Sequence, residues 1–85
     1  NGHWAEIILH SENEGIFKGL EIEKEIKEKN VFQEDLWVKK GDKVNSFNGA
    51  NDAIGTLVLK FETKEELEKA LSNQESWLKV IVINV

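Results

Sequence analysis

The sequence predicts a small α+β domain in which two helices cover one face of an antiparallel sheet. Three observations point to this class. Apolar and polar residues alternate over several short segments, as they do in strands with one buried face. Two segments rich in Glu and Lys carry apolar residues at helical spacing. The chain has 85 residues, so we expect one domain, residues 1–85.

Two strands are predicted at the start of the chain. Residues 4–10 alternate, and three apolar side chains share one face: Ala5, Ile7 and Leu9. Residues 11–15 are polar and end in glycine, which is typical of a turn. A short second strand over 16–20 follows, and we expect the two strands to pair as a hairpin.

A helix and a third strand come next. Residues 22–29 have two isoleucines four positions apart among good helix formers, and Asn30 is a plausible helix end. Residues 31–40 then read as a strand with Trp37 on one face. Three apolar residues are expected on the other face: Phe32, Leu36 and Val38.

The second half repeats this order. Residues 54–62 alternate strongly, with one apolar face made by Leu57, Leu59 and Phe61. Thr63 and Glu66 match a capping box, which predicts a helix from there to near Gln74. Residues 78–85 are almost wholly apolar, which is typical of an interior strand. The order ββαββαβ contains the ferredoxin-like split βαβ arrangement.

Composition excludes several classes of function. Cysteine is absent, so disulfides and thiolate metal sites are excluded. The net charge is −5 and every basic residue is lysine, which disfavours binding to nucleic acid. No apolar run approaches the roughly 20 residues that span a bilayer, so we expect a soluble cytoplasmic protein with no membrane partner. Methionine is also absent, and we therefore expect a domain excised from a longer protein.

The sequence offers no self-contained active site. His3 and His10 fall on opposite faces of one strand, so they predict no shared metal site. No phosphate-binding glycine loop and no catalytic triad pattern occurs. Trp4, Trp37 and Trp77 are interpreted as core or edge packing. Asp52, at the entrance to a strand, is either a turn residue or part of a substrate-site rim. We predict no catalytic and no metal-binding residue.

Four segments nevertheless resemble the C-terminal subdomain of ATP-grasp ligases. They are residues 15–21 (GIFKGLE), 38–44 (VKKGDKV), 51–59 (NDAIGTLVL) and 62–67 (ETKEEL). The similarity is to the carboxylate–amine (L-amino-acid) ligase type, and the biotin carboxylase C-terminal domain has a similar run. Lys64 stands where many biotin carboxylases have arginine, and Leu67 where the family has alanine, which favours the amino-acid ligase type.

This resemblance implies that the chain is one domain of a larger enzyme and that another domain carries out the chemistry. Such ligases phosphorylate a carboxylate with ATP and Mg²⁺, and both are held by the preceding ATP-grasp domain. This chain would bind no cofactor itself. It would be inactive alone, pack on that domain as its partner, and close the substrate site. The loop over 45–55 would face the shared cleft, with Asn48, Asn51 and Asp52 as candidates for its rim. A homodimeric parent is a further expectation.

Two other hypotheses remain open from the residues. One is a regulatory small-molecule binding domain of the ACT type, which shares the βαββαβ layout. The other is a protein-interaction module that uses an exposed sheet face around Trp4, Ile8 and Trp37.

Overall fold

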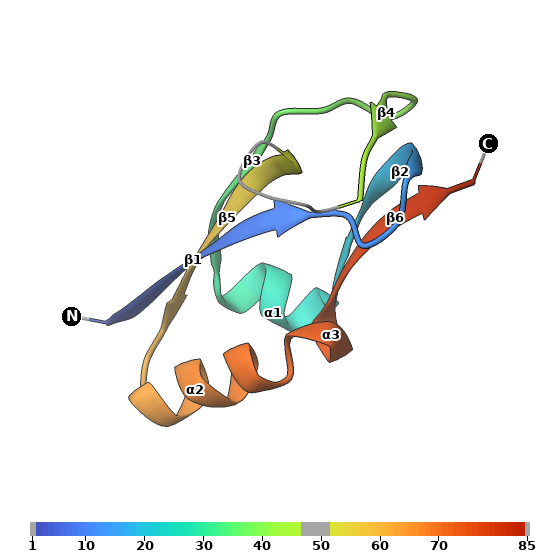
Figure 1. Cartoon of the computed structure of the whole chain (residues 1–85). Helices are drawn as coiled ribbons and strands as arrows, with labels where there is room; N and C mark the ends of the chain where they lie inside the picture. Colours follow the sequence, from blue (N-terminus) through green and yellow to red (C-terminus); the bar gives the residue numbers. More distant parts are fainter. Residues whose placement is uncertain (1, 47–51, 85) are drawn as a thin grey trace.

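The computed structural model describes residues 2–46 and 52–84 of the chain. These residues form six strands and three helices (Figure 1). In chain order they are β1 (His3–His10), β2 (Gly15–Ile22), α1 (Lys24–Lys29), β3 (Val31–Leu36), β4 (Lys43–Val44), β5 (Ala53–Phe61), α2 (Lys64–Ser72), α3 (Gln74–Trp77) and β6 (Leu78–Ile83). The predicted α+β class is confirmed, and the order is compatible with a split βαβ arrangement.

The strands form two three-stranded antiparallel sheets where one sheet was expected. Their orders are β1–β5–β3 and β4–β2–β6. The predicted hairpin between the first two strands is therefore wrong, because β1 pairs with β5 and β2 with β6. Gly15 explains the divergence: a Cβ on this residue would lie 2.1 Å from the carbonyl oxygen of Ile83. Only glycine lets β2 begin in such close contact with β6.

Both helical connections cross from one sheet to the other. Helix α1 joins β2 to β3, and helices α2 and α3 join β5 to β6. All three helices lie on the same side of the strands (Figure 1). The amide of Glu23 donates to the carbonyl of Trp77 at 2.8 Å and ties the two connections together. Thr63 Oγ1 accepts a hydrogen bond from the Glu66 amide at 3.1 Å, as the predicted cap requires.

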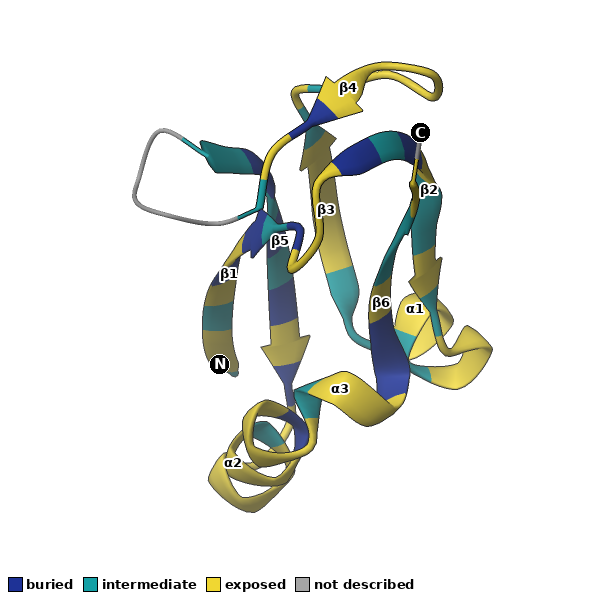
Figure 2. Cartoon of the chain, turned by 45° about the vertical axis from the view of Figure 1, so that its right-hand side comes forward, coloured by how far each residue is buried: buried dark blue, intermediate teal, exposed yellow. Residues whose placement is uncertain are grey.

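A single core lies between the two sheets and the helices (Figure 2). Leu57 and Leu59 of β5 are completely buried. They are joined by side chains from both sheets and from the second helical connection: Ile7, Leu9, Phe17, Val44, Phe61, Ala70, Trp77 and Leu78. The inward faces predicted for residues 4–10 and 54–62 are confirmed, because period-two alternation decides which side chains meet the core.

Trp77 closes the core where α2 passes into α3. Its side chain is 4% exposed, and its indole Nε1–H donates to the carbonyl of Ala70 at 2.8 Å. Burying the ring removes a large apolar surface from water, and the hydrogen bond satisfies its polar atom. The sequence did not predict the short helix that carries this residue; it placed a single helix up to about Gln74.

Three predicted boundaries also differ from the structure. The first helix begins at Lys24 rather than at residue 22, because β2 continues to Ile22. The third strand ends at Leu36 instead of residue 40, since the chain then turns through Gly41, whose φ is +102°. The apolar segment 78–85 is a paired strand but not an interior one. Within the described residues β6 pairs with β2 alone, so it lies at a sheet edge.

Candidate functional site

The outward side of sheet β1–β5–β3 carries most of the large apolar side chains that are exposed in the described residues. The register aligns three rows across the strands. Trp4 is opposite Lys60. Val58 of β5 lies between Glu6 on β1 and Gln33 on β3, and Thr56 lies between Ile8 and Asp35. Directly paired residues point to the same side of a sheet. We call this surface, with Phe32 and Trp37 added below, the outer face.

Two aromatic rings form one end of the outer face. Trp4 and Phe32 meet edge to face, with ring centroids 4.9 Å apart and an interplanar angle of 84°. The Lys60 Nζ lies 5.3 Å from the centre of the Trp4 ring, within range of a cation–π interaction. These two contacts fix the geometry of side chains that would otherwise move freely in water.

A β-bulge places Phe32 on this face. Val31 is paired with Leu59 and Gln33 with Val58, so β3 advances by two residues while β5 advances by one. Phe32 is the extra residue, and bulges of this kind re-aim a side chain. The prediction that Phe32 and Leu36 share a face is therefore wrong. The polar run that follows Phe32 interrupts the alternation and was the available sign of the bulge.

Trp37 occupies the opposite end of the outer face. Its backbone amide donates to the carbonyl of Ile54 at 2.8 Å, which keeps the chain beside β5 after β3 has ended. Its indole Nε1–H donates to the carboxylate of Asp35 at 3.4 Å. Asp35 is opposite Thr56, so this contact directs the ring toward the row that contains Ile8.

The exposed fractions show how uncovered these side chains are. Trp4 is 50% exposed, Ile8 49%, Phe32 67% and Trp37 57%. They are four of the six large apolar residues that are exposed in the described part of the chain, the other two being Leu71 and Ile83. Apolar residues scattered singly need no explanation, but a concentration on one sheet face indicates a contact surface. The expectation that Trp4, Ile8 and Trp37 share an exposed face is confirmed, and Phe32 extends it.

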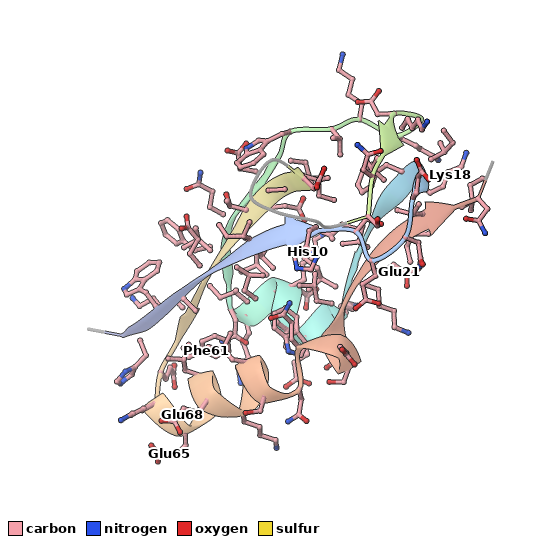
Figure 3. The ribbon with its side chains drawn as sticks, in the orientation of Figure 1. His10, Lys18, Glu21, Phe61, Glu65 and Glu68 are labelled. Atoms are coloured by element: carbon pink, nitrogen blue, oxygen red, sulfur yellow. The ribbon has the colours of Figure 1, made fainter. Side chains whose placement is uncertain are left out.

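Of the three rim candidates predicted from the sequence, the structure describes Asp52 alone. Asn48 and Asn51 lie outside the described residues. Asp52 is half-buried and directly precedes β5. His3 and His10 occupy the two ends of β1, opposite Phe61 and Ala53 respectively. Seven residues of strand separate them by about 23 Å, and Figure 3 shows His10 far from Phe61 and α2.

Metal-binding clusters and membrane-spanning helices are both absent from the described residues. Residues 2–46 and 52–84 hold no group of three or more His, Asp or Glu side chains able to bind a metal. In the same part of the chain, no helix combines the length and the apolar character that crossing a bilayer requires.

Two grooves lie beside the outer face, and Ile8 of that face lines the second of them. One, of about 570 Å³, separates α1 from α2 and α3; Phe61, Ala70 and Trp77 contribute apolar lining. The other, of about 380 Å³, is bordered by β6 on one side and by the end of β1 with the following turn on the other. The polar side chains Asn30 and Asn73 in the first groove already donate to backbone carbonyls. These two amides thus stabilise the walls of that groove.

Comparison with known proteins identifies the fold. No model of a protein family matches the chain, and no curated protein does. Among solved structures, the crystal structure of phosphoribosylglycinamide synthetase from Anaerococcus prevotii, an ATP-grasp ligase, is similar with a TM-score of 0.66. The identity is 21%, and the match covers 98% of this chain and 21% of that protein. The chain thus spans about a fifth of the length of the ligase it matches and shares the fold of one segment of it.

Proposed function

We propose that this chain is an accessory domain of an ATP-dependent carboxylate–amine ligase of the ATP-grasp type. In this proposal it packs on the catalytic part of the enzyme and closes the substrate site. The observation that carries the proposal is the extent of the structural match: almost the whole chain corresponds to about a fifth of a much larger ligase. A chain that matches only about a fifth of a ligase supports a role as one domain of an enzyme.

The segments that resemble the ligase family have structural tasks, which supports a shared architecture. Gly41 adopts a positive φ, and its amide donates to the carbonyl of Phe17 at 2.8 Å. The Asp42 carboxylate accepts from the amide of Lys39 at 2.8 Å and closes the same turn. A Cβ on Gly55 would lie 2.4 Å from the carbonyl oxygen of Asp35. The motif residues thus shape the turn and strand contacts on which the fold depends.

The chemistry of the ligase would come from the rest of the polypeptide. ATP and Mg²⁺ would be held by the catalytic part, where the phosphorylated carboxylate forms. A domain packed over that site excludes water, which otherwise hydrolyses an acyl phosphate. The described residues of this chain fit such a covering role, because four of their six exposed large apolar side chains gather on one face.

The outer face is the surface that we propose contacts the catalytic part. Burying an aromatic side chain at an interface yields more free energy than burying most other residues, and aromatic anchors dominate many interfaces. The face also carries the carboxylates of Glu6 and Asp35 beside a single lysine, Lys60. We therefore expect an apolar partner surface with basic residues around its rim.

The experiment uses the catalytic part and the 85-residue chain as separate proteins. We expect the gene upstream of this domain to encode an ATP-grasp domain. Trp4→Ser with Phe32→Ser should reduce binding of the chain to the catalytic part at least about 30-fold, as loss of two interface anchors does, measured by titration calorimetry. Leu71→Ser is the matched control, because Leu71 is also exposed but lies on α2; it should bind like the unmodified chain.

Two results would contradict the proposal. One is a gene that encodes no ATP-grasp domain beside this one. The other is ATP hydrolysis by the purified 85-residue chain that follows the protein through repeated purification. Unchanged binding by the Trp4 and Phe32 variant would reject the outer face as the contact surface. It would not affect the assignment as a ligase domain, which the upstream gene sequence tests.

A general protein-interaction module is the second candidate, and the outer face also favours it. The two functions differ in the partner: an interaction module would bind a separate protein through Trp4, Ile8, Phe32 and Trp37. Binding of the chain to the catalytic part decides between them.

A further inference from the structure

The second groove, of about 380 Å³, runs along the exposed edge of a strand. It is lined by five consecutive residues of β6, from Leu78 to Val82, and by six consecutive residues from Ile8 to Asn13. Consecutive residues of a strand point to alternate faces, so a groove lined by all of them follows the edge of the strand. Within the described residues β6 pairs only with β2, and the backbone groups on its other edge face this groove.

The edge of β6 carries few of the usual protections against pairing with another chain. Proteins blunt such edges with proline, bulges or charged side chains, lysine above all. β6 contains no proline, and the irregularity in its pairing with β2 lies between Phe17 and Gly19, on the other strand. Its one charged residue is Lys79, which lines the groove and is opposite Glu21 of β2. The remaining residues of the strand are apolar, and most are β-branched, which favours strand addition.

Acidic residues stand at both ends of the groove. Glu75 belongs to α3, which leads directly into Leu78. Glu12 belongs to the turn before β2. The first residue of β2 that pairs with β6 is Ile16, which is opposite Ile83 at the other end of β6. Both carboxylates line the groove, both are exposed, and neither forms an ion pair with another described residue. The span from Leu78 to Val82 is about 13 Å at the rise of a strand.

We propose that the β6 edge binds one extended peptide segment that has an apolar middle and a basic residue at each end. The segment adds a strand beside β6, so that main-chain hydrogen bonds supply affinity and alternate side chains supply specificity. The carboxylates of Glu12 and Glu75 select lysine or arginine about four residues apart. This inference uses β6 and does not depend on the ligase assignment; of the exposed apolar residues of the outer face, only Ile8 also lines the groove.

Charge also argues against a second copy of this chain as the occupant. Antiparallel pairing of two β6 strands about a twofold axis would bring the Glu75 end of one copy to the Glu12 end of the other. Like charges that face each other across an interface disfavour that pairing. A basic segment from a different sequence meets the same two positions with attraction.

The test uses the full 85-residue chain and synthetic seven-residue peptides as probes. The first probe is Thr-Lys-Val-Thr-Val-Lys-Thr, in which the two lysines are four residues apart. The second probe has glutamate at both lysine positions, and the third has proline in place of the central threonine. Binding is followed by two-dimensional amide NMR and by hydrogen exchange. We expect shifts and slower exchange at Val80, Ile81 and Val82, and little binding of the proline probe.

Charge reversal in the protein makes the test specific. Glu12→Lys with Glu75→Lys should weaken binding of the lysine probe about fivefold to tenfold and should make the glutamate probe the better ligand. Glu28→Lys with Glu62→Lys is the matched control: it changes the net charge equally at exposed positions outside the groove, and it should keep the original preference. Retained shifts away from β6 confirm that each variant is folded.

Three results would overturn the proposal. The first is equal binding of the lysine and glutamate probes. The second is a set of peptide-induced shifts on the outer face, at Trp4 or Phe32, with none along β6. The third is concentration-dependent dimerisation in sedimentation, with exchange at β6 slowed in the absence of any peptide, which would identify a second copy as the occupant.

Discussion

The two sides of sheet β1–β5–β3 are made by the same strands and differ in what covers them. On the inner side Leu57 and Leu59 are completely buried, whereas on the outer side Trp4 and Phe32 are 50% and 67% exposed. Burial of the inner side chains stabilises the fold at about 25 cal/mol for each Å² of apolar surface removed from water. The outer rings gain little of this in the isolated domain. Folding explains the inner side, and the proposed contact with the catalytic part of a ligase would account for the outer side.

The largest expected effect tests the difference between the two sides with two neighbouring residues of β5. Leu59→Ala leaves a cavity in the centre of the core and should lower the free energy of unfolding by about 2–5 kcal/mol. Val58→Ala removes apolar atoms on the half-buried outer side and should cost less than about 1 kcal/mol. Urea denaturation followed by circular dichroism measures both values. Equal losses would mean that the two sides contribute alike to folding.

A smaller effect is expected where β3 and β5 approach most closely. Gly55→Ala would place a Cβ 2.4 Å from the carbonyl oxygen of Asp35, and backbone cannot move aside without loss of strand pairing. We expect a loss of stability of about 1–3 kcal/mol and faster amide exchange along β3. The control is Gly2→Ala, where the new atom would meet only the flexible side chain of Lys60. If both variants unfold at the same urea concentration, the close approach has no energetic consequence.

The smallest of these effects concerns the helix beside the inner side. Helix α2 contacts β1 and β5 and buries Ala70 in the core. Thr63→Ala removes the hydroxyl that accepts from the Glu66 amide and should cost about 1 kcal/mol. Thr63→Ser keeps this hydrogen bond, and the stability of this variant should stay close to that of the original chain. Thermal unfolding measures the stability of both variants. A Ser variant as unstable as the Ala variant would show that the methyl group, and not the cap, matters.

The side chains on the inner side of the sheet could be predicted from the sequence, whereas those on the outer side could be predicted only in part. Strict alternation in residues 4–10 and 54–62 decides which side chains are buried, because a strand has a period of two. The bulge at Phe32 breaks that period, and no local rule says which face the extra residue takes. Trp4, Ile8 and Trp37 were grouped correctly as an exposed face, since they fall opposite the core residues or beyond the strand end.

Long-range pairing was the least predictable property. The polar segment 11–15 looks like a hairpin turn, yet it carries the chain from one sheet to the other. The reason is the contact between Gly15 and Ile83, which are 68 positions apart, and local sequence preferences contain no information on such a partner. The same division into two sheets leaves β6 at an edge, although its apolar composition is typical of an interior strand. The rim candidates Asn48 and Asn51 stay predictions.

The burial of Trp77 has a spectroscopic consequence. Three indoles report on this domain, and only that of Trp77 is enclosed, with its ring N–H bonded to the carbonyl of Ala70. When Trp4 and Trp37 are replaced by phenylalanine, the remaining fluorescence comes from one chromophore at the junction of α2 and α3. Its emission shifts to longer wavelength when water reaches that junction and stays constant when a molecule settles on the outer face. Unfolding can thus be followed without interference from binding at the outer face.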